Sequence, residues 1–128
     1  MSPELKLQQG RRRNEHGNEV MMAEVAQLDE IAAQLMRVQR HWHDGDRDRQ
    51  LAAALTASRT VWHAIQAALA EATLPLPLEV RQNLLILSVY AESKIGACEA
   101  APDADTLGSL IALTRTLAGS LKEWREAA

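Results

Sequence analysis

The segment 41–48 (HWHDGDRD) holds the densest group of potential metal ligands in the chain. A calcium-binding loop needs oxygen ligands at alternate positions, a glycine at the sixth position and a bidentate glutamate at the twelfth. Counted from Asp44, the three alternating aspartates fit the start of such a loop. Arg49 stands where the glycine is needed and Leu55 where the glutamate is needed, so the pattern excludes a calcium loop.

His41 and His43 suggest a transition-metal site as a second chemistry for this segment. Residues two apart on a helix point in different directions, and no third ligand is evident nearby in the sequence. We therefore expect a solvated turn between two helices, in which Asp46 or Asp48 caps the next helix. The sequence predicts no metal ion and no other cofactor.

The other reactive side chains do not form a catalytic group. Ser58 and His63 are five residues apart, so on a helix they point to different faces. The Glu-x-x-His pairs that hold metals in helical bundles are missing, as are phosphate-loop and dinucleotide fingerprints. Cys98 is the only cysteine, which fits a reducing compartment, and we expect it to be a small buried hydrophobe. The sequence therefore predicts a protein that is not an enzyme.

Composition points to one helical domain. The 128 residues suffice for a single core, and 47% of them are hydrophobic, with no Phe and many Ala and Leu. A net charge of −3 argues against a nucleic-acid binder, and we expect the run 11–13 (RRR) to be a solvated lead-in. The sequence shows no signal peptide and no membrane span, so we expect a cytoplasmic protein.

Helical periodicity divides the chain into a tail and four helices. Residues 1–18 are expected to form a polar tail that can be disordered, and residues 19–128 a single α-helical domain. Asn18 would cap the first helix, and the second would run from about residue 46 to about residue 72. The two apolar stripes are Met21, Val25, Leu28, Ile31, Leu35, Val38 and Trp42, and then Leu51, Leu55, Ser58, Trp62, Ile65 and Leu69.

The third predicted helix, from Pro77 to Ala101, has a different pattern. Its consecutive apolar residues 84–87 (LLIL) cannot share one face, because neighbours on a helix are about 100° apart. A helix that is apolar nearly all round is expected at the centre of a bundle. The fourth helix would follow Pro102, capped by Asp103 or Asp105. The predicted fold is all-α, a small bundle of about four helices around a central apolar third helix.

Three segments taken in order resemble a known family. SRTVW (58–62), AALA (67–70) and LPLEVRQNL (76–84) are similar to the core pattern of FlaF, the flagellar biosynthesis regulators of alphaproteobacteria. Members of that family typically have Asn-Arg-x-Leu-Trp, a short linker, and then Leu-Pro-x-x-Leu-Arg-x-Asn-Leu. A last segment ends in Ala-Gly-Leu, which LAGSL (117–121) approximates. Ser58 and Val61 depart from the usual Asn and Leu.

The resemblance implies a cytoplasmic, non-enzymatic protein needed for flagellin production and secretion. Such a protein would act as a flagellin-binding export chaperone, which shields flagellin's amphipathic terminal helices before secretion, opposed or accompanied by the partner regulator FlbT. One alternative is a regulator of flagellin translation that acts through contact with FlbT and does not bind flagellin. Another is a structural bundle in a larger assembly. In each case we expect no direct contact with nucleic acid.

The segments that carry the resemblance also supply the candidate partner-binding residues. Each has a structural alternative: Trp62 can be a core residue, Arg59 a solvated charge, and Leu76 part of a linker packed on the bundle. Residues at the start of the third helix can instead fix that linker through local hydrogen bonds. The candidates are Arg59, Trp62, Leu69, Leu76, Pro77, Arg81, Asn83 and Leu84.

Overall fold

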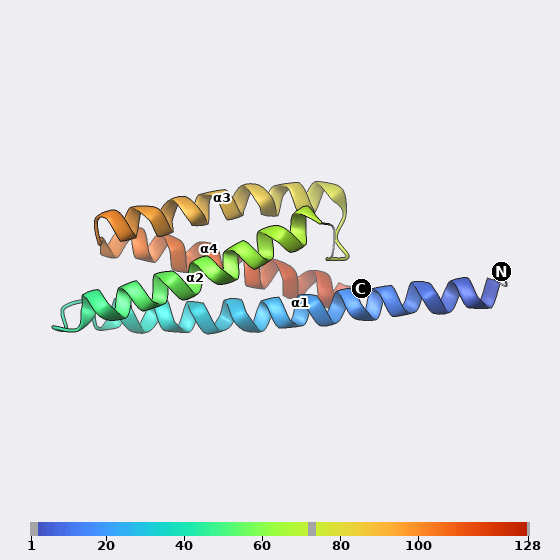
Figure 1. The fold of residues 1–128 in the computed structure, drawn as a ribbon, viewed down its shortest axis with the longest axis horizontal. Helices are drawn as coiled ribbons and strands as arrows, with labels where there is room; N and C mark the ends of the chain where they lie inside the picture. Colours follow the sequence, from blue (N-terminus) through green and yellow to red (C-terminus); the bar gives the residue numbers. More distant parts are fainter. Residues whose placement is uncertain (1–2, 72–73, 128) are drawn as a thin grey trace.

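Four α-helices make up the part of the chain that the computed structural model describes, residues 3–71 and 74–127 (Figure 1). Side chains are described over residues 17–71 and 74–124. The helices are α1 (Pro3–Arg40), α2 (Arg47–Ala70), α3 (Leu78–Ala100) and α4 (Ala104–Ala127), and these ranges contain no strand. The predicted small all-α bundle is confirmed. None of the helices so described is long and apolar enough to cross a membrane.

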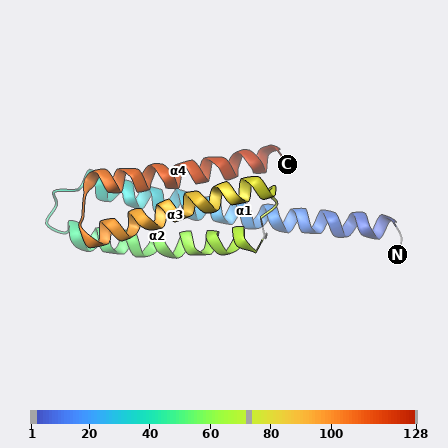
Figure 2. The same ribbon diagram turned by 90° about the horizontal axis from the view of Figure 1, so that it is seen from above.

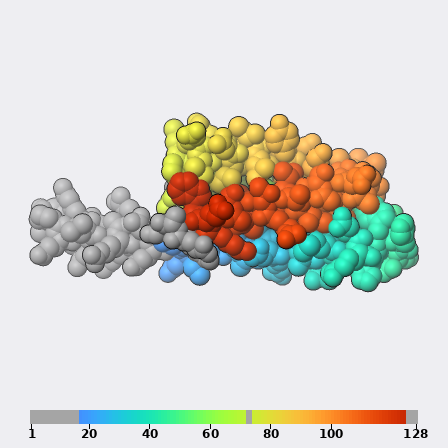
Figure 3. All heavy atoms as spheres, turned by 180° about the vertical axis from the view of Figure 1, so that it is seen from behind, coloured from blue at the N-terminus to red at the C-terminus, as the bar shows by residue number. Residues whose placement is uncertain are grey.

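The helices form a ring in which each packs against two others, in the order α1, α2, α3, α4 and back to α1. Consecutive helices run antiparallel, as in an up-and-down four-helix bundle (Figures 1 and 2). Over the described residues, the diagonal pairs α1–α3 and α2–α4 make no close backbone contact. α1 extends beyond the other three helices at its N-terminal end, and Figure 3 shows α4 lying alongside both α1 and α3.

The core consists largely of the apolar stripes that the sequence predicts. Trp62 is fully buried in α2, so the interpretation of this residue as a core Trp is confirmed. Two buried hydroxyl groups satisfy themselves within their own helices: Ser58 Oγ donates to the Ala54 carbonyl and Thr114 Oγ1 to the Leu110 carbonyl, each over 2.8 Å. The largest fully buried side chains include Met21, Leu28, Leu35, Leu55, Ile65, Leu69, Leu107, Leu110 and Leu117.

The first helix begins earlier than expected. α1 starts at Pro3, so Asn18 lies inside the helix and the prediction that it caps the helix is wrong. Gly17, a poor helix former, is buried against the α2–α3 linker, and a Cβ added there would lie 3.0 Å from Pro75 Cδ. The missing side chain lets the linker rest directly on α1. The side chains of residues 1–16 lie outside the described part, so the division into a tail (1–18) and a domain (19–128) stays a prediction.

The prediction that the third helix is central is wrong. α3 occupies one corner of the ring and packs against α2 and α4 (Figure 2). Of the consecutive apolar residues 84–87, Leu84 is buried, two leucines are half-buried, and Ile86 is exposed. Side chains from all four corners fill the middle of the ring, which leaves no place for an axial helix. The excess apolar character of α3 therefore lies on the outside of the bundle.

The α1–α2 turn and the α3–α4 turn differ in how the helix that follows is capped. Asp103 caps α4, because its Oδ2 accepts from the Thr106 N–H over 3.2 Å and from the Thr106 hydroxyl over 2.8 Å. This cap agrees with the sequence. Asp46 holds the N-cap position of α2 but makes no capping hydrogen bond, and its carboxylate pairs with Arg49 over 2.6 Å.

Candidate functional site

The placement of α3 follows from its inner face. The helix starts directly after Pro77, whose carbonyl accepts the first helical hydrogen bond from the Arg81 N–H over 3.0 Å. From there a single buried stripe recurs at four- and three-residue spacing and faces the core. It consists of Leu84, Ser88, Ala91, Ile95 and Cys98.

Polar contacts with α2 hold α3 in one rotation about its axis. Arg59 makes a two-pronged ion pair with Glu99, and its Nη1 donates to Oε2 over 2.8 Å. His63 lies 2.5 Å from Glu92. The hydrogen bonds from Arg59 lower the pKa of the Glu99 carboxyl below its ordinary value. These contacts are only partly buried, so they contribute more to orientation than to stability.

With the inner stripe and the α2 contacts fixed, the opposite side of α3 faces solvent. We call this surface the α3 outer face. Ile86, Val89 and Tyr90 lie on it and are 56%, 61% and 60% exposed. These are unusual values for large apolar side chains grouped within five residues of one helix. The α3 outer face comprises Gln82, Asn83, Ile86, Val89, Tyr90, Ser93, Gly96, Ala97 and Ala100.

Between Gln82 and Ala100 the α3 outer face carries no charged side chain; the exposed Glu79 lies on the same side of the helix, seven residues before Ile86. A typical surface helix keeps its apolar residues on one side and its charges on the other. α3 has a buried apolar side and an exposed side that is also uncharged, while its carboxylates on the α2 side, Glu92 and Glu99, are already paired. Such a surface binds another apolar surface at a low desolvation cost, because no charge has to leave water.

The sequence model of a flagellar protein family, described as flagellar protein FlaF, matches residues 10–121. The matched range takes in the stripes of all four helices and the whole α3 outer face. The chain belongs to the FlaF family. No curated protein and no solved structure matches it.

The candidate partner-binding residues of this FlaF chain fall into two groups. Four of them, Trp62, Leu69, Leu76 and Leu84, are buried and offer almost no surface to a partner in this conformation. The other four lie at or near the surface: Arg59 pairs with Glu99, Pro77 is exposed, Arg81 is half-buried, and Asn83 lies on the α3 outer face.

The sequence did not predict Ile86, Val89 and Tyr90 as surface residues, because the third helix was expected at the centre of the bundle, where all of its sides are buried. A signal for their exposure was present. Ile86 and Tyr90 are four residues apart, and both lie between the positions of the stripe that Leu84, Ser88 and Ala91 form. α2 and α4 together cover only one of the two apolar stripes of α3, and the second stripe faces solvent.

A second surface is the furrow between α1 and α2, where two hollows of about 300 Å³ each share Gln34. One wall carries small α2 residues, among them Ala53 and Ala57. The α1 wall places the polar side chains of Gln27, Glu30 and Gln34 beside the apolar Ile31 and Val38. A partner helix would have to desolvate these polar groups, so the furrow is the less favourable of the two surfaces.

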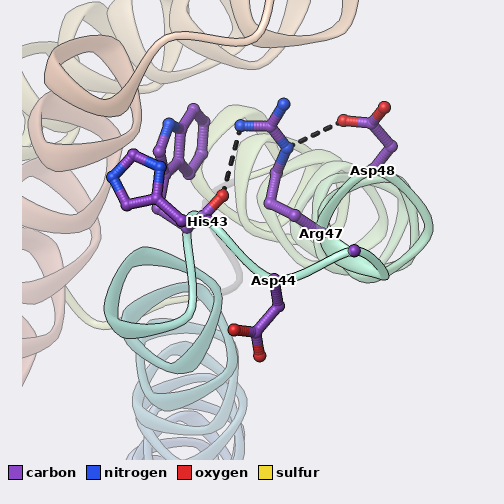
Figure 4. A pocket seen from close by; sticks show the side chains of 6 residues that line it. His43, Asp44, Arg47 and Asp48 are labelled. Atoms are coloured by element: carbon purple, nitrogen blue, oxygen red, sulfur yellow. Dashed lines mark hydrogen bonds and ion pairs between the residues drawn. The ribbon is translucent and has the colours of Figure 1, made fainter.

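Two further hollows in the described part of the chain contain no cluster of catalytic or metal-binding groups. Figure 4 looks into one of about 260 Å³ at the α1–α2 turn, where the Arg47 guanidinium stacks 4.3 Å from the centre of the Trp42 ring and pairs with Asp48. Cys98 lines another, of about 340 Å³, between α2 and α3. Burial raises the pKa of the Cys98 thiol, which disfavours the reactive thiolate. Among the described side chains, no three metal-binding groups converge.

Proposed function

We propose that this FlaF protein is a non-enzymatic flagellin-binding export chaperone and that the α3 outer face receives one amphipathic terminal helix of flagellin. The protein would act in the cytoplasm, before flagellin is secreted. The family supports a flagellar role. The observation that carries the proposal is the uncharged, exposed apolar surface on a helix that the bundle holds in a fixed orientation.

The size of the α3 outer face suits a helical client. From Gln82 to Ala100 the helix rises by roughly 27 Å, or about five turns, which matches a client helix of similar length. An amphipathic client helix typically presents apolar anchors at positions i, i+3, i+4 and i+7. Ile86, Val89 and Tyr90 of the α3 outer face are exposed apolar side chains that such anchors can contact. Covering a client's apolar side in this way would prevent its premature association with other flagellin subunits.

The expected affinity is modest. Burial of a large apolar side chain contributes about 1.5–3 kcal/mol, and each large residue of the face has roughly half of its surface left to bury. Three such residues therefore supply about 2–4.5 kcal/mol from the FlaF side, before the cost of association is subtracted. A client that must be released to the secretion apparatus needs a complex of this limited strength.

The test is binding of purified flagellin, and of peptides covering its terminal helices, to the wild-type protein and to Ile86→Asp and Tyr90→Asp. We expect each substitution to weaken binding at least tenfold, since it places a charge in the apolar contact. Met22→Asp is the matched control: Met22 is 52% exposed on α1, diagonally across the ring from α3.

Equal binding by the wild-type protein and both α3 variants would refute the proposed site. If the wild-type protein does not bind flagellin but binds FlbT, the chaperone function is wrong, and regulation through FlbT takes its place. Circular dichroism of each variant verifies that the helices remain folded, so that lost binding is not lost structure.

A further inference from the structure

The α3 outer face is divided into a half with bulky side chains and a half with small ones. Ile86, Val89 and Tyr90 lie toward its N-terminal half. The C-terminal half carries Ser93, Gly96, Ala97 and Ala100, all exposed. A Cβ added at Gly96 would meet nothing within 4 Å, so the bundle itself does not require a glycine there. The face thus has knobs at one end and open space at the other.

This division makes the face complementary to itself in one orientation. If two copies pair their α3 helices antiparallel about a two-fold axis that passes between Tyr90 and Ser93, Ile86 of each copy faces Ala97 of the other. Tyr90 then faces Ser93 of the other copy, and Val89 lies close to its Gly96. Large residues fill the space above small ones along the contact, which is the condition for close helix packing.

The charge pattern permits the same pairing. Between Gln82 and Ala100 the face carries no charged side chain, so two copies bring no like charges together along this part of its central line. In a two-fold interface each contact occurs twice, which doubles the effect of every favourable pair. A contact roughly 27 Å long through one helix per copy belongs to the small interface class, so the association is expected to be weak and dependent on concentration.

We infer that a second copy of this chain occupies the α3 outer face when no client is bound, through an antiparallel, two-fold α3–α3 contact. The dimer protects the apolar surface of the free protein from water. On the proposed function, the client helix and the second copy use the same surface, so client binding requires the dimer to dissociate. The dimer itself does not depend on that function.

Sedimentation velocity of the isolated protein over a range of concentrations tests the inference without flagellin. We expect reversible dimerisation in the wild-type protein and in the control Met22→Lys. Ile86→Lys and Ala97→Glu each place an unpaired charge in the contact twice, and we expect each to weaken the dimer by about tenfold or more.

The double variant Ile86→Lys/Ala97→Glu tests the register. Positions 86 and 97 are roughly 16 Å apart along one helix, too far for an ion pair within a copy. Between copies in the inferred register they face each other, so the double variant should recover dimerisation to within about threefold of wild type. Circular dichroism of the monomers confirms that these exposed positions tolerate the changes.

Three results would overturn the inference: a wild-type protein that stays monomeric at all concentrations, single variants that dimerise like wild type, or a double variant weaker than both single variants. None of these results bears on flagellin binding. Conversely, a dimer with the expected variant pattern in a protein that does not bind flagellin would support the inference and refute the proposed function.

Discussion

The same substitution at two positions of α3 tests where this helix lies in the bundle. Ile86 is 56% exposed on the outer face, and Ile95 is fully buried on the inner face nine residues later. Full burial of such a side chain contributes about 1.5–3 kcal/mol, and a little under half of the Ile86 surface is buried. Ile86→Ala therefore removes about 1 kcal/mol of burial free energy. The higher helix propensity of Ala returns a few tenths of a kcal/mol. We expect a net cost of about 0.5 kcal/mol.

Ile95→Ala is expected to cost far more. Truncation of a fully buried Ile to Ala costs about 2–5 kcal/mol, because the loss of burial is joined by the cavity that remains. For a domain of this size 1 kcal/mol corresponds to a Tm change of about 4 °C. Ile95→Ala should therefore lower Tm by about 8–20 °C and Ile86→Ala by about 2 °C.

Thermal and urea unfolding followed by circular dichroism measure both variants against the wild type. The protein concentration is kept low and equal, so that self-association does not add to the stability of the wild type. If Ile86→Ala costs as much as Ile95→Ala, α3 is walled in on all sides, and the outer face described above does not exist. If neither substitution is costly, α3 does not form part of the core.

Three further outcomes follow from single contacts. Gly119→Ala should stabilise the protein by about 1 kcal/mol in urea unfolding, since the new Cβ meets nothing within 4 Å in the interior of α4. Gly17→Ala should stabilise it less or destabilise it, because its Cβ would lie 3.0 Å from Pro75 Cδ, and equal gains in the two variants would contradict the close approach of the linker to α1. Because the pKa of Glu99 is lowered, the Arg59–Glu99 pair stabilises the fold above the unfolded-state pKa of about 4.3, and this contribution is lost as the pH falls through the folded pKa. Glu99→Gln should therefore reduce the loss of stability at acid pH, and an unchanged loss would show that the pair contributes nothing. Cys98 should react with a thiol reagent far more slowly in the native protein than in urea, because it is buried and its pKa is raised; rapid native labelling would show that the α2–α3 seam opens readily.

The stripes of α1 and α2 could be predicted from the sequence because each of these helices has one apolar side. Leu51, Leu55, Ser58 and Ile65 repeat at fours and threes, and all four are buried, including the serine. A single apolar side on a helix has one physical solution, which is to face the core. A short polar side chain before a helical pattern also predicted a cap at Asp103 or Asp105, and the structure has the cap at Asp103.

The position of α3 could not be predicted in the same way. The run 84–87 shows that the helix is apolar on more than one side, but the sequence does not say whether the second side meets this chain, another chain or water. A central position and a corner position with an exposed apolar face give the same pattern. The structure distinguishes the two positions: α3 contacts α2 and α4 but not α1, so it lies at a corner of the ring.

The start of α1 could not be predicted from the sequence for a different reason. Gly17 and Asn18 are poor helix formers, and local preference predicts a break there. In the folded chain Pro75 of a distant linker lies against Gly17, a contact about sixty residues away that no local pattern reveals. The candidate site was misplaced in part for a related reason: the segments that carry the family resemblance are mostly core positions, such as Trp62 and Leu84.

The contact between α1 and α4 has a consequence for synthesis of the protein. The other three helix–helix contacts join neighbours in the chain, so they involve short loops and can form early and quickly. The α1–α4 contact joins the first helix to the last, so it cannot form until the C-terminal segment has left the ribosome. In an unfinished chain, the apolar side of α1 that α4 would cover is therefore exposed to solvent. A stop codon before residue 104 would yield a three-helix fragment that is prone to aggregation.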